Sequence, residues 1–177
     1  MNSFEKLIEQ LYFRIPNNLA IYDQLTGVYN ANWLYKIGKK KYSNKVCYIT
    51  LIDLNNFKKI NDIAGHAMGN GMLIALGKQL SCLKSIDETV ECCRLGGDEF
   101  LIFSSMDLSS FLVDDSSELL SFGIFYKNSE CSVENAIKQA DIKMYKYKKK
   151  FKKDIKSDKD IVKIIRNMTR KRKALGE

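Results

Sequence analysis

The sequence is poor in the residues from which several common kinds of site are built. Its 177 residues include one histidine, His66, and one proline, Pro16. A single histidine excludes chemistry that needs paired histidines. Five cysteines are present, but none is arranged as a CxxC pair, so neither a zinc site nor a disulfide framework is indicated. We interpret them as reduced thiols of a cytoplasmic protein.

Long apolar runs are also missing. No stretch approaches the ~20 apolar residues that a membrane-spanning helix needs. The N-terminus lacks the basic start and apolar centre of a signal peptide. Hydrophobic residues nevertheless make up 45% of the chain, which supports a sizeable core and excludes a wholly disordered chain. The length fits one domain with short appendages.

Positive charge is concentrated near the C-terminus. The chain carries a net charge of +8, but residues 146–173 hold 14 of the 29 lysines and arginines against three of the 21 acids, a net of +11. The remainder, with 15 basic and 18 acidic residues, carries −3. The basic stretch is compatible with contact to nucleic acid, an anionic membrane or nucleotide phosphates, and equally with a solvated helix and tail.

The apolar pattern alternates between strand-like and helix-like segments. A buried central strand is predicted by the run VCYITLID at 46–53, which is rich in β-branched residues. A tight hairpin around Gly96-Gly97 is predicted over 90–103, and another strand over 118–127. Helical spacing occurs in the segments 3–14, 30–42, 57–62, 67–83, 107–115, 133–150 and, from Ile161 to Met168, in the basic stretch. This order predicts a palm-like α+β domain with helices packed on an antiparallel-type sheet.

Acidic residues mark two of these predicted elements. Asp53 ends the buried strand, and Asp98-Glu99 follow the glycine pair of the hairpin about 45 residues later. If the hairpin lies beside the strand, the carboxylates converge and repel one another unless a divalent cation joins them. Oxygen ligands favour Mg²⁺ or Mn²⁺, whose shell substrate phosphates complete, so the pattern indicates phosphoryl or nucleotidyl transfer. The spacing alone equally allows Asp53 to cap the next turn and Gly-Gly-Asp to be a plain hairpin tip.

Four segments together resemble the GGDEF family of diguanylate cyclases. The family signature is contained in RLGGDEF at 94–100, and the opening motif, DxLTGLxN, is similar to YDQLTGVYN at 22–30. The block DxDxFKxxNDxxGHxxGD resembles IDLNNFKKINDIAGHAMGN at 52–70, and the closing helix ADxALYxAK resembles ADIKMYKYKK at 140–149. The four occur in the family order over roughly residues 20–152.

The resemblance implies a fold and a metal site. The fold would be a palm of the ferredoxin-like or nucleotidyl cyclase kind, with a central, mainly antiparallel sheet flanked by helices. Asp53 and Asp98 would hold Mg²⁺ or Mn²⁺, with the backbone carbonyl of Leu54 as a further ligand. Glu99 would help to deprotonate or orient an attacking 3′-hydroxyl. Asp53, Asp98 and Glu99 are therefore the candidate catalytic residues.

The resemblance also assigns phosphate contacts. Phosphate would pack on the Gly96-Gly97 turn, where missing side chains let the backbone approach closely. Lys148 and Lys152 fall where the family places cations on the terminal phosphates. The second of these is usually arginine in the family, and lysine keeps the charge without the fork geometry.

The nucleobase contacts implied by the resemblance include one departure. Asn61 matches the family's guanine-contacting asparagine, and Phe57 and Lys58 match positions that shape the site. Asn70 stands where the family has an aspartate that accepts hydrogen bonds from guanine. An asparagine is uncharged and also offers donors, so the guanine preference is weakened and adenine becomes acceptable. We favour guanine because Asn61 is retained.

The implied reaction condenses two GTP molecules into cyclic di-GMP, with release of pyrophosphate, at the interface of a two-fold homodimer.

The expected organisation is an N-terminal helix and lead-in (1–20), the GGDEF cyclase domain (21–152) and a basic, helical C-terminal tail (153–177). Because only about 20 residues precede the opening motif, we expect no sensor domain ahead of it. Regulation would then act through the first helix or the tail, by dimerisation or by a partner in trans.

Three further features depart from the family pattern. The product-inhibition motif RxxD falls on Asp87 and Val90, so we expect no feedback inhibition there. Ala31-Asn32 replace the arginines that usually follow the opening motif. The stretch from Phe100 to Ala140 is shorter than in the family, which predicts a trimmed helix.

Three alternatives stay open at this point. One is a related cyclase that makes an adenine-containing cyclic dinucleotide or oligonucleotide. Another is a catalytically silent GGDEF module that binds nucleotide, against which the intact Asp53, Asp98 and Glu99 argue. The third is a nucleic-acid binder acting through the basic tail, which has few aromatic residues for base stacking.

Overall fold

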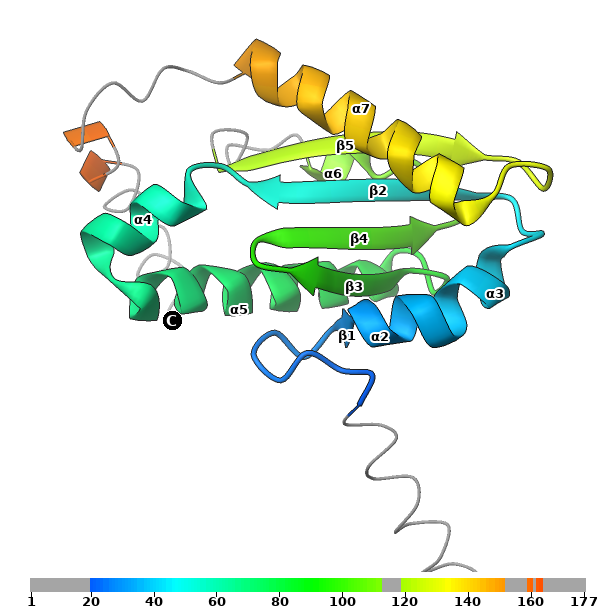
Figure 1. Ribbon diagram of the computed structural model, residues 1–177, viewed down its shortest axis with the longest axis horizontal. Helices are drawn as coiled ribbons and strands as arrows, with labels where there is room; N and C mark the ends of the chain where they lie inside the picture. Colours follow the sequence, from blue (N-terminus) through cyan, green and yellow to red (C-terminus); the bar gives the residue numbers. More distant parts are fainter. Residues whose placement is uncertain (1–19, 113–118, 152–158, 161, 164–177) are drawn as a thin grey trace, which may run out of the picture.

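The computed structural model describes residues 20–112, 119–151, 159–160 and 162–163. Within them the chain forms a five-stranded sheet in the order β1-β3-β4-β2-β5, with helices on both faces (Figure 1). The strands are β1 (Tyr29–Asn30), β2 (Cys47–Leu54), β3 (Glu91–Gly96), β4 (Glu99–Ser104) and β5 (Leu120–Lys127). The helix predicted over 3–14 lies outside the described residues, and of the helix predicted from Ile161 to Met168 only residues 162–163, which are helical, are described.

Strand β2 is an interior strand, because it pairs antiparallel with β4 on one side and with β5 on the other. Strands β3 and β4 form the predicted antiparallel hairpin. The exception is β1, which runs parallel to β3 and places Tyr29 opposite Cys93. The sequence did not predict β1, because two residues carry no periodicity. The sheet is therefore mainly antiparallel, and the predicted α+β class is confirmed.

The helices occupy the predicted segments with small shifts. One continuous helical segment over 31–42 contains a π-helical stretch in its middle, and α4 is longer than the predicted 57–62. None of the described helices has both the length and the hydropathy to cross a membrane. The helical elements are α2 (Ala31–Trp33), η1 (Leu34–Gly38), α3 (Lys39–Tyr42), α4 (Phe57–Ala64), α5 (His66–Cys82), η2 (Leu83–Ser85), α6 (Ser109–Leu112) and α7 (Val133–Phe151).

Alternating strand residues serve two cores, one on each face of the sheet. On β2, Ile52 and Leu54 join the core beneath α5 and α6, whereas Ile49 and Leu51 join the core beneath α7 and α2 (Figure 1). On β4, Phe100–Phe103 are all fully buried, two on each face. Burying one such side chain stabilises the fold by ~1.5–3 kcal/mol. Strands that are apolar on both faces lie in the middle of a covered sheet, as the 46–53 pattern predicted.

Close packing on β5 fixes the position of α7, which carries several lysines toward the edge of the sheet. A Cβ added at Gly123 would collide with the backbone of Ala140 and Met144, so glycine permits this approach. Ala136 and Ala140 are fully buried against the sheet. Helix α7 is thereby held across β5 and β2.

Candidate active site

The three candidate carboxylates converge at one edge of the sheet. Asp53, the penultimate residue of β2, lies directly opposite Glu99, the first residue of β4. The backbone N–H of Leu54 donates to the carbonyl of Asp98 at 3.3 Å, which ties the hairpin turn to the end of β2. Asp53 has the same strand parity as Ile49 and Leu51, so its side chain lies on the face that α7 covers.

The glycine pair gives the turn a shape that other residues resist. Gly96 has φ +153° and Gly97 has φ +53°, both in regions that side chains disfavour. The space beside both is open, since no heavy atom lies within 4 Å of a Cβ built at either glycine. Backbone conformation rather than crowding therefore requires glycine here, and the exposed turn leaves its backbone accessible to a ligand.

Electrostatic repulsion is built into this edge. Burial and the neighbouring Asp53 carboxylate raise the pKa of Asp98 above its ordinary value. Partial burial, followed by Asp53 and Asp98, likewise raises the pKa of Glu99. Lys148 of α7 offsets part of this repulsion, with its Nζ 2.5 Å from Oδ1 of Asp53. The sequence-based expectation of converging, mutually repelling carboxylates thus matches the geometry.

The donor set at this edge fits a small divalent cation. Among the described residues, no group of three or more histidine, cysteine, aspartate or glutamate side chains is arranged to hold a metal. Mg²⁺, however, is commonly held through one or two carboxylates, with phosphates and water filling the other positions. Asp53 and Asp98 supply such a pair of hard oxygen ligands, and their mutual repulsion is the conflict that a cation relieves.

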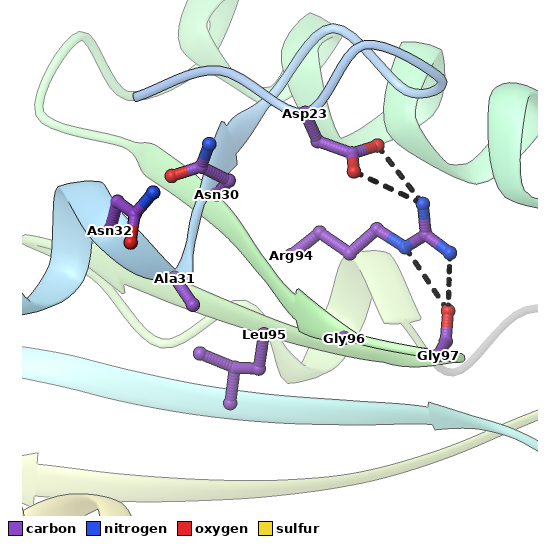
Figure 2. Close-up of a pocket in the computed structure, with 8 residues that line it drawn as sticks. All are labelled: Asp23, Asn30, Ala31, Asn32, Arg94, Leu95, Gly96 and Gly97. Atoms are coloured by element: carbon purple, nitrogen blue, oxygen red, sulfur yellow. Dashed lines mark hydrogen bonds and ion pairs between the residues drawn. The ribbon is translucent and has the colours of Figure 1, made fainter. Parts of the chain in front are cut away.

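Arg94 clamps the glycine turn, a role that the sequence analysis missed (Figure 2). Its Nη1 contacts both carboxylate oxygens of Asp23 at 3.1 Å, while Nε and Nη2 donate to the carbonyl of Gly97 at 3.1 and 2.7 Å. Asp23 also accepts from the backbone and hydroxyl of Thr26. Both charged residues lie within the motifs quoted above, so opposite charges in two such motifs were the available signal.

A cavity of about 380 Å³ lies on the β1 side of this hairpin. Figure 2 shows that it is bordered by the Arg94–Asp23 pair and by the start of α2. Asn30 on its wall is already engaged, because its side chain donates to Ala20 and Tyr22 carbonyls and accepts from the Trp33 N–H. The carboxylates of the candidate site do not line this cavity, which shares only the glycine turn with them. Its lining residues are Asp23, Asn30, Ala31, Asn32, Arg94, Leu95, Gly96 and Gly97.

The predicted base-contacting residues lie on the two helices that follow β2. Asn61 is on α4, and Asn70 is exposed on α5. A Cβ on Gly69 would collide with the Asn61 side chain, so glycine brings the two helices together. Oδ1 of Asn61 is buried against this contact and has no hydrogen-bond partner among the described residues.

The remaining predicted substrate residues fall in different surroundings. Phe57 packs, partly buried, against the core beneath α5, and Lys58 is exposed on α4. Lys152 lies outside the described residues. The structure thus brings the glycine turn, the three carboxylates and Lys148 together, and it places Asn61 and Asn70 on neighbouring helices beyond the end of β2.

Asp87, at the position expected to lack an inhibitory arginine, serves the fold instead. Its carboxylate accepts from the N–H and hydroxyl of Thr89 at 2.9 and 2.6 Å, and from the N–H and hydroxyl of Ser105 at 2.8 and 2.9 Å. Burial alone would raise the pKa of Asp87, but these hydrogen bonds outweigh burial and hold it below the ordinary value. Val90, the second position, is fully buried in the core.

Fold and site together define a palm-like α+β domain with a carboxylate centre beside a Gly-Gly turn. The family model described as diguanylate cyclase, GGDEF domain, matches residues 20–118. The chain belongs to this GGDEF family. A curated relative, diguanylate cyclase DgcP of Escherichia coli K12, is 31% identical over 155 residues, which cover 76% of this chain. The chain spans 42% of the length of that relative.

Solved structures of the same fold support the architecture. Diguanylate cyclase SiaD from Pseudomonas aeruginosa, solved with its activator SiaC, superposes with a TM-score of 0.62 at 22% identity, covering 83% of this chain and 68% of that one. The GGDEF domain of DgcB from Caulobacter crescentus, solved with c-di-GMP, gives a TM-score of 0.62 at 17% identity, covering 73% and 88% of the two chains. At these identities the similarity establishes the fold.

Proposed function

We propose that this chain is a diguanylate cyclase that condenses two GTP molecules into cyclic di-GMP and releases two pyrophosphates. The observation that carries the proposal is the convergence of Asp53 and Asp98 beside the Gly96-Gly97 turn, within a GGDEF-family domain. Two hard carboxylate ligands next to an open, glycine-built turn suit a nucleoside triphosphate with its divalent cation.

Each residue of the centre has a distinct task in the proposed reaction. Asp53, Asp98 and the Leu54 carbonyl would hold Mg²⁺ or Mn²⁺, which polarises the attacked phosphate and neutralises the leaving pyrophosphate. Glu99, whose raised pKa makes it a better proton acceptor, is suited to take the proton of the attacking 3′-hydroxyl. The Gly96-Gly97 backbone would pack against phosphate, where no side chain intervenes.

Ring closure requires two copies of the site. In each half-reaction a 3′-oxygen forms a bond to the α-phosphorus of the other nucleotide, and the bond to pyrophosphate breaks. One carboxylate centre per chain offers a place for one triphosphate, so a two-fold homodimer would bring two nucleotides face to face. Positioning of this kind supplies much of the acceleration in phosphoryl and nucleotidyl transfer.

Base selection is the part of the proposal that this chain modifies. Asn70 offers an amide where a carboxylate would accept two guanine donors, so an adenine-containing cyclic dinucleotide is the second candidate product. GTP remains the proposed substrate, because Asn61 is present on the neighbouring helix.

The test is to incubate the full chain with Mg²⁺ and GTP, ATP or an equal mixture, and to identify products by mass. We expect cyclic di-GMP from GTP and no product from the Asp98→Ala variant. An exclusively adenine-containing product would establish the second candidate. Nucleotide binding without any cyclic product would identify a silent module, and product from Asp98→Ala would show that the metal site is misplaced.

We also propose that product does not inhibit this enzyme through the position of Asp87, since a fully hydrogen-bonded carboxylate has no cation to offer a phosphate. Initial rates with and without ~100 µM added cyclic di-GMP, roughly a hundred-fold excess over a micromolar site, should agree within error. Strong inhibition that persists in Asp87→Asn would reveal a product site elsewhere.

A further inference from the structure

The ion pair between Lys148 and Asp53 links the C-terminal half of α7 to the end of β2, where the candidate carboxylates lie. Nζ lies 2.5 Å from Oδ1 of Asp53, and the Lys148 side chain is 34% exposed against 13% for Asp53. The helix that carries Lys148 is fixed by the close contact of its backbone with Gly123. The ammonium therefore approaches a well-held carboxylate from a well-held helix, on a flexible stem that is itself partly in solvent.

Among the described residues, Lys148 is the cation in contact with this carboxylate centre. Arg94, the other cation that influences Asp98, is occupied by Asp23 and by the carbonyl of Gly97. Lys148 offsets the negative charge of Asp98 and Glu99 as well as contacting Asp53. Within the described part of the chain, one ammonium is thus shared among three carboxylates, which leaves a net negative charge there.

The ammonium of Lys148 and a divalent ion compete for the Asp53 carboxylate, because both are cations attracted to the same negative group. Two cations held within about 4 Å of each other repel, and this repulsion grows as the local dielectric constant falls. Lysine is a point charge on a four-carbon stem, so it can leave Asp53 without moving its helix. An anionic triphosphate would give the displaced ammonium a new partner at the same edge.

We propose that Lys148 is an internal counter-ion of Asp53 with which a divalent metal competes, so that this lysine suppresses binding of free metal until a triphosphate takes up its ammonium at the phosphate position that the family resemblance assigns to it. This inference rests on the proposed function. It makes Lys148 a positioning residue that suppresses binding of free metal and favours the metal–nucleotide complex. A purely structural tether between α7 and β2 would instead leave free-metal affinity unchanged on removal.

The test is Mn²⁺ binding to the full chain, followed by the electron paramagnetic resonance signal of free Mn²⁺, with and without a non-hydrolysable GTP analogue. Lys148→Met should bind free Mn²⁺ about ten-fold more tightly than the original chain, because an oxygen of Asp53 is released. The same variant should bind the Mn²⁺–nucleotide complex at least ten-fold more weakly. Tighter binding of free Mn²⁺ together with weaker binding of the Mn²⁺–nucleotide complex, in one variant, is the result expected if Lys148 changes partner from Asp53 to the triphosphate.

Lys149→Met is the matched control, since Lys149 is exposed on the next position of α7 and lies 4.5 Å from the ring centre of Tyr145. It should leave both affinities unchanged. Lys148→Gln, which keeps length and polarity, is the second variant should Lys148→Met fold poorly, as judged by its thermal unfolding, and the same opposite shifts are expected of it.

Two results overturn the inference in different ways. Unchanged or weaker binding of free Mn²⁺ by the Lys148 variants, with nucleotide-dependent binding retained by the original chain, overturns the counter-ion role alone. Absence of any Mn²⁺ binding by the original chain, even with the nucleotide analogue present, overturns the proposed function together with the inference.

Discussion

Two aspartates at opposite ends of strand β3 have opposite electrostatic surroundings. Asp87, just before the strand, accepts four hydrogen bonds from Thr89 and Ser105, and its pKa is held below the ordinary value. Asp98, just after the strand, is partly buried beside Asp53, and its pKa is raised. A carboxylate whose oxygens accept hydrogen bonds from the protein stabilises the fold. A carboxylate repelled by a neighbouring carboxylate is available to bind a ligand.

The largest expected effect is on product formation, when the repelled carboxylate of Asp98 is replaced. Asp98→Asn should lower product formation at least ~1,000-fold, as is common when a group that stabilises transition-state charge is lost. The free energy of unfolding should be unchanged or higher, because a repelled negative charge is removed. Product formation and urea unfolding measure the two quantities, with exposed Glu130→Gln as the control. A marked loss of both stability and activity in Asp98→Asn would contradict the claim that Asp98 serves activity whereas Asp87 serves stability.

The satisfied carboxylate should give the reverse result. Asp87→Ala should reduce the free energy of unfolding by roughly 2–4 kcal/mol, because the four hydrogen bonds that the buried Asp87 carboxylate accepts from Thr89 and Ser105 are lost. The activity per folded molecule should be retained, since Asp87 lies at the far end of β3 from the glycine turn. Urea unfolding checks the first expectation, with the exposed neighbour Glu88→Gln as control. A change under about 0.5 kcal/mol, within the range of surface substitutions, would refute the stabilising role.

A smaller effect is expected at the base-contacting position. Asn70→Asp restores a charged acceptor for the N–H donors of guanine, which adenine lacks at the same positions. We expect the ratio of kcat/KM for GTP over ATP to rise about ten-fold, equivalent to ~1.4 kcal/mol. Exposed Asn44→Asp serves as the control. An unchanged ratio would show that Asn70 does not contact the base.

The smallest effect concerns the pH dependence of stability. Since the hydrogen bonds from Thr89 and Ser105 hold the folded-state pKa of Asp87 below its ordinary value, its stabilising contribution is complete above that ordinary value and is lost as pH falls through the folded-state pKa. The difference in free energy of unfolding between the original chain and Asp87→Asn should therefore be constant from pH 7 to 5 and narrow below about 4. Urea titrations at pH 7, 5, 4 and 3 measure it. A difference that widens in acid would have the wrong sign.

Much of the fold was predictable because its elements have strong local patterns. The apolar run ending in Asp53, the paired arms around Gly96-Gly97 and the stripe along α7 each match an observed element. Strand β1 was not predictable, since two residues paired in parallel with β3 leave no periodic signal. Helix α4 extends to Ala64 beyond the predicted short helix.

The site was predictable where it rested on motif residues and not where it rested on partners distant in sequence. Asp53, Asp98 and Glu99 were expected to converge, and they do. The Arg94–Asp23 clamp joins residues 71 positions apart, and the Lys148–Asp53 pair joins residues 95 apart. Such pairings depend on tertiary packing, and for the first of them the opposite charges in two family motifs were the available signal.

Fully buried Lys127 is a second case in which the tertiary contacts of a residue could not be predicted from the sequence. Its Nζ donates to the carbonyls of Ser43, Lys45 and Asn128 at 2.9–3.0 Å, which satisfies a charge that sequence alone would place in solvent. A buried ammonium with three acceptors holds the loop before β2 to the end of β5. Its role depends on backbone carbonyls that no side-chain pattern reveals.

The most direct measurement is a crystal structure of the chain with Mn²⁺ and a non-hydrolysable GTP analogue, with the ion located by its anomalous signal. Our interpretation predicts manganese within ~2.1 Å of one oxygen of Asp53 and one of Asp98, with phosphate oxygens on the same ion and the Lys148 ammonium moved from Asp53 to the phosphates. Manganese bound away from both aspartates, or nucleotide bound with neither carboxylate near a metal, would contradict it.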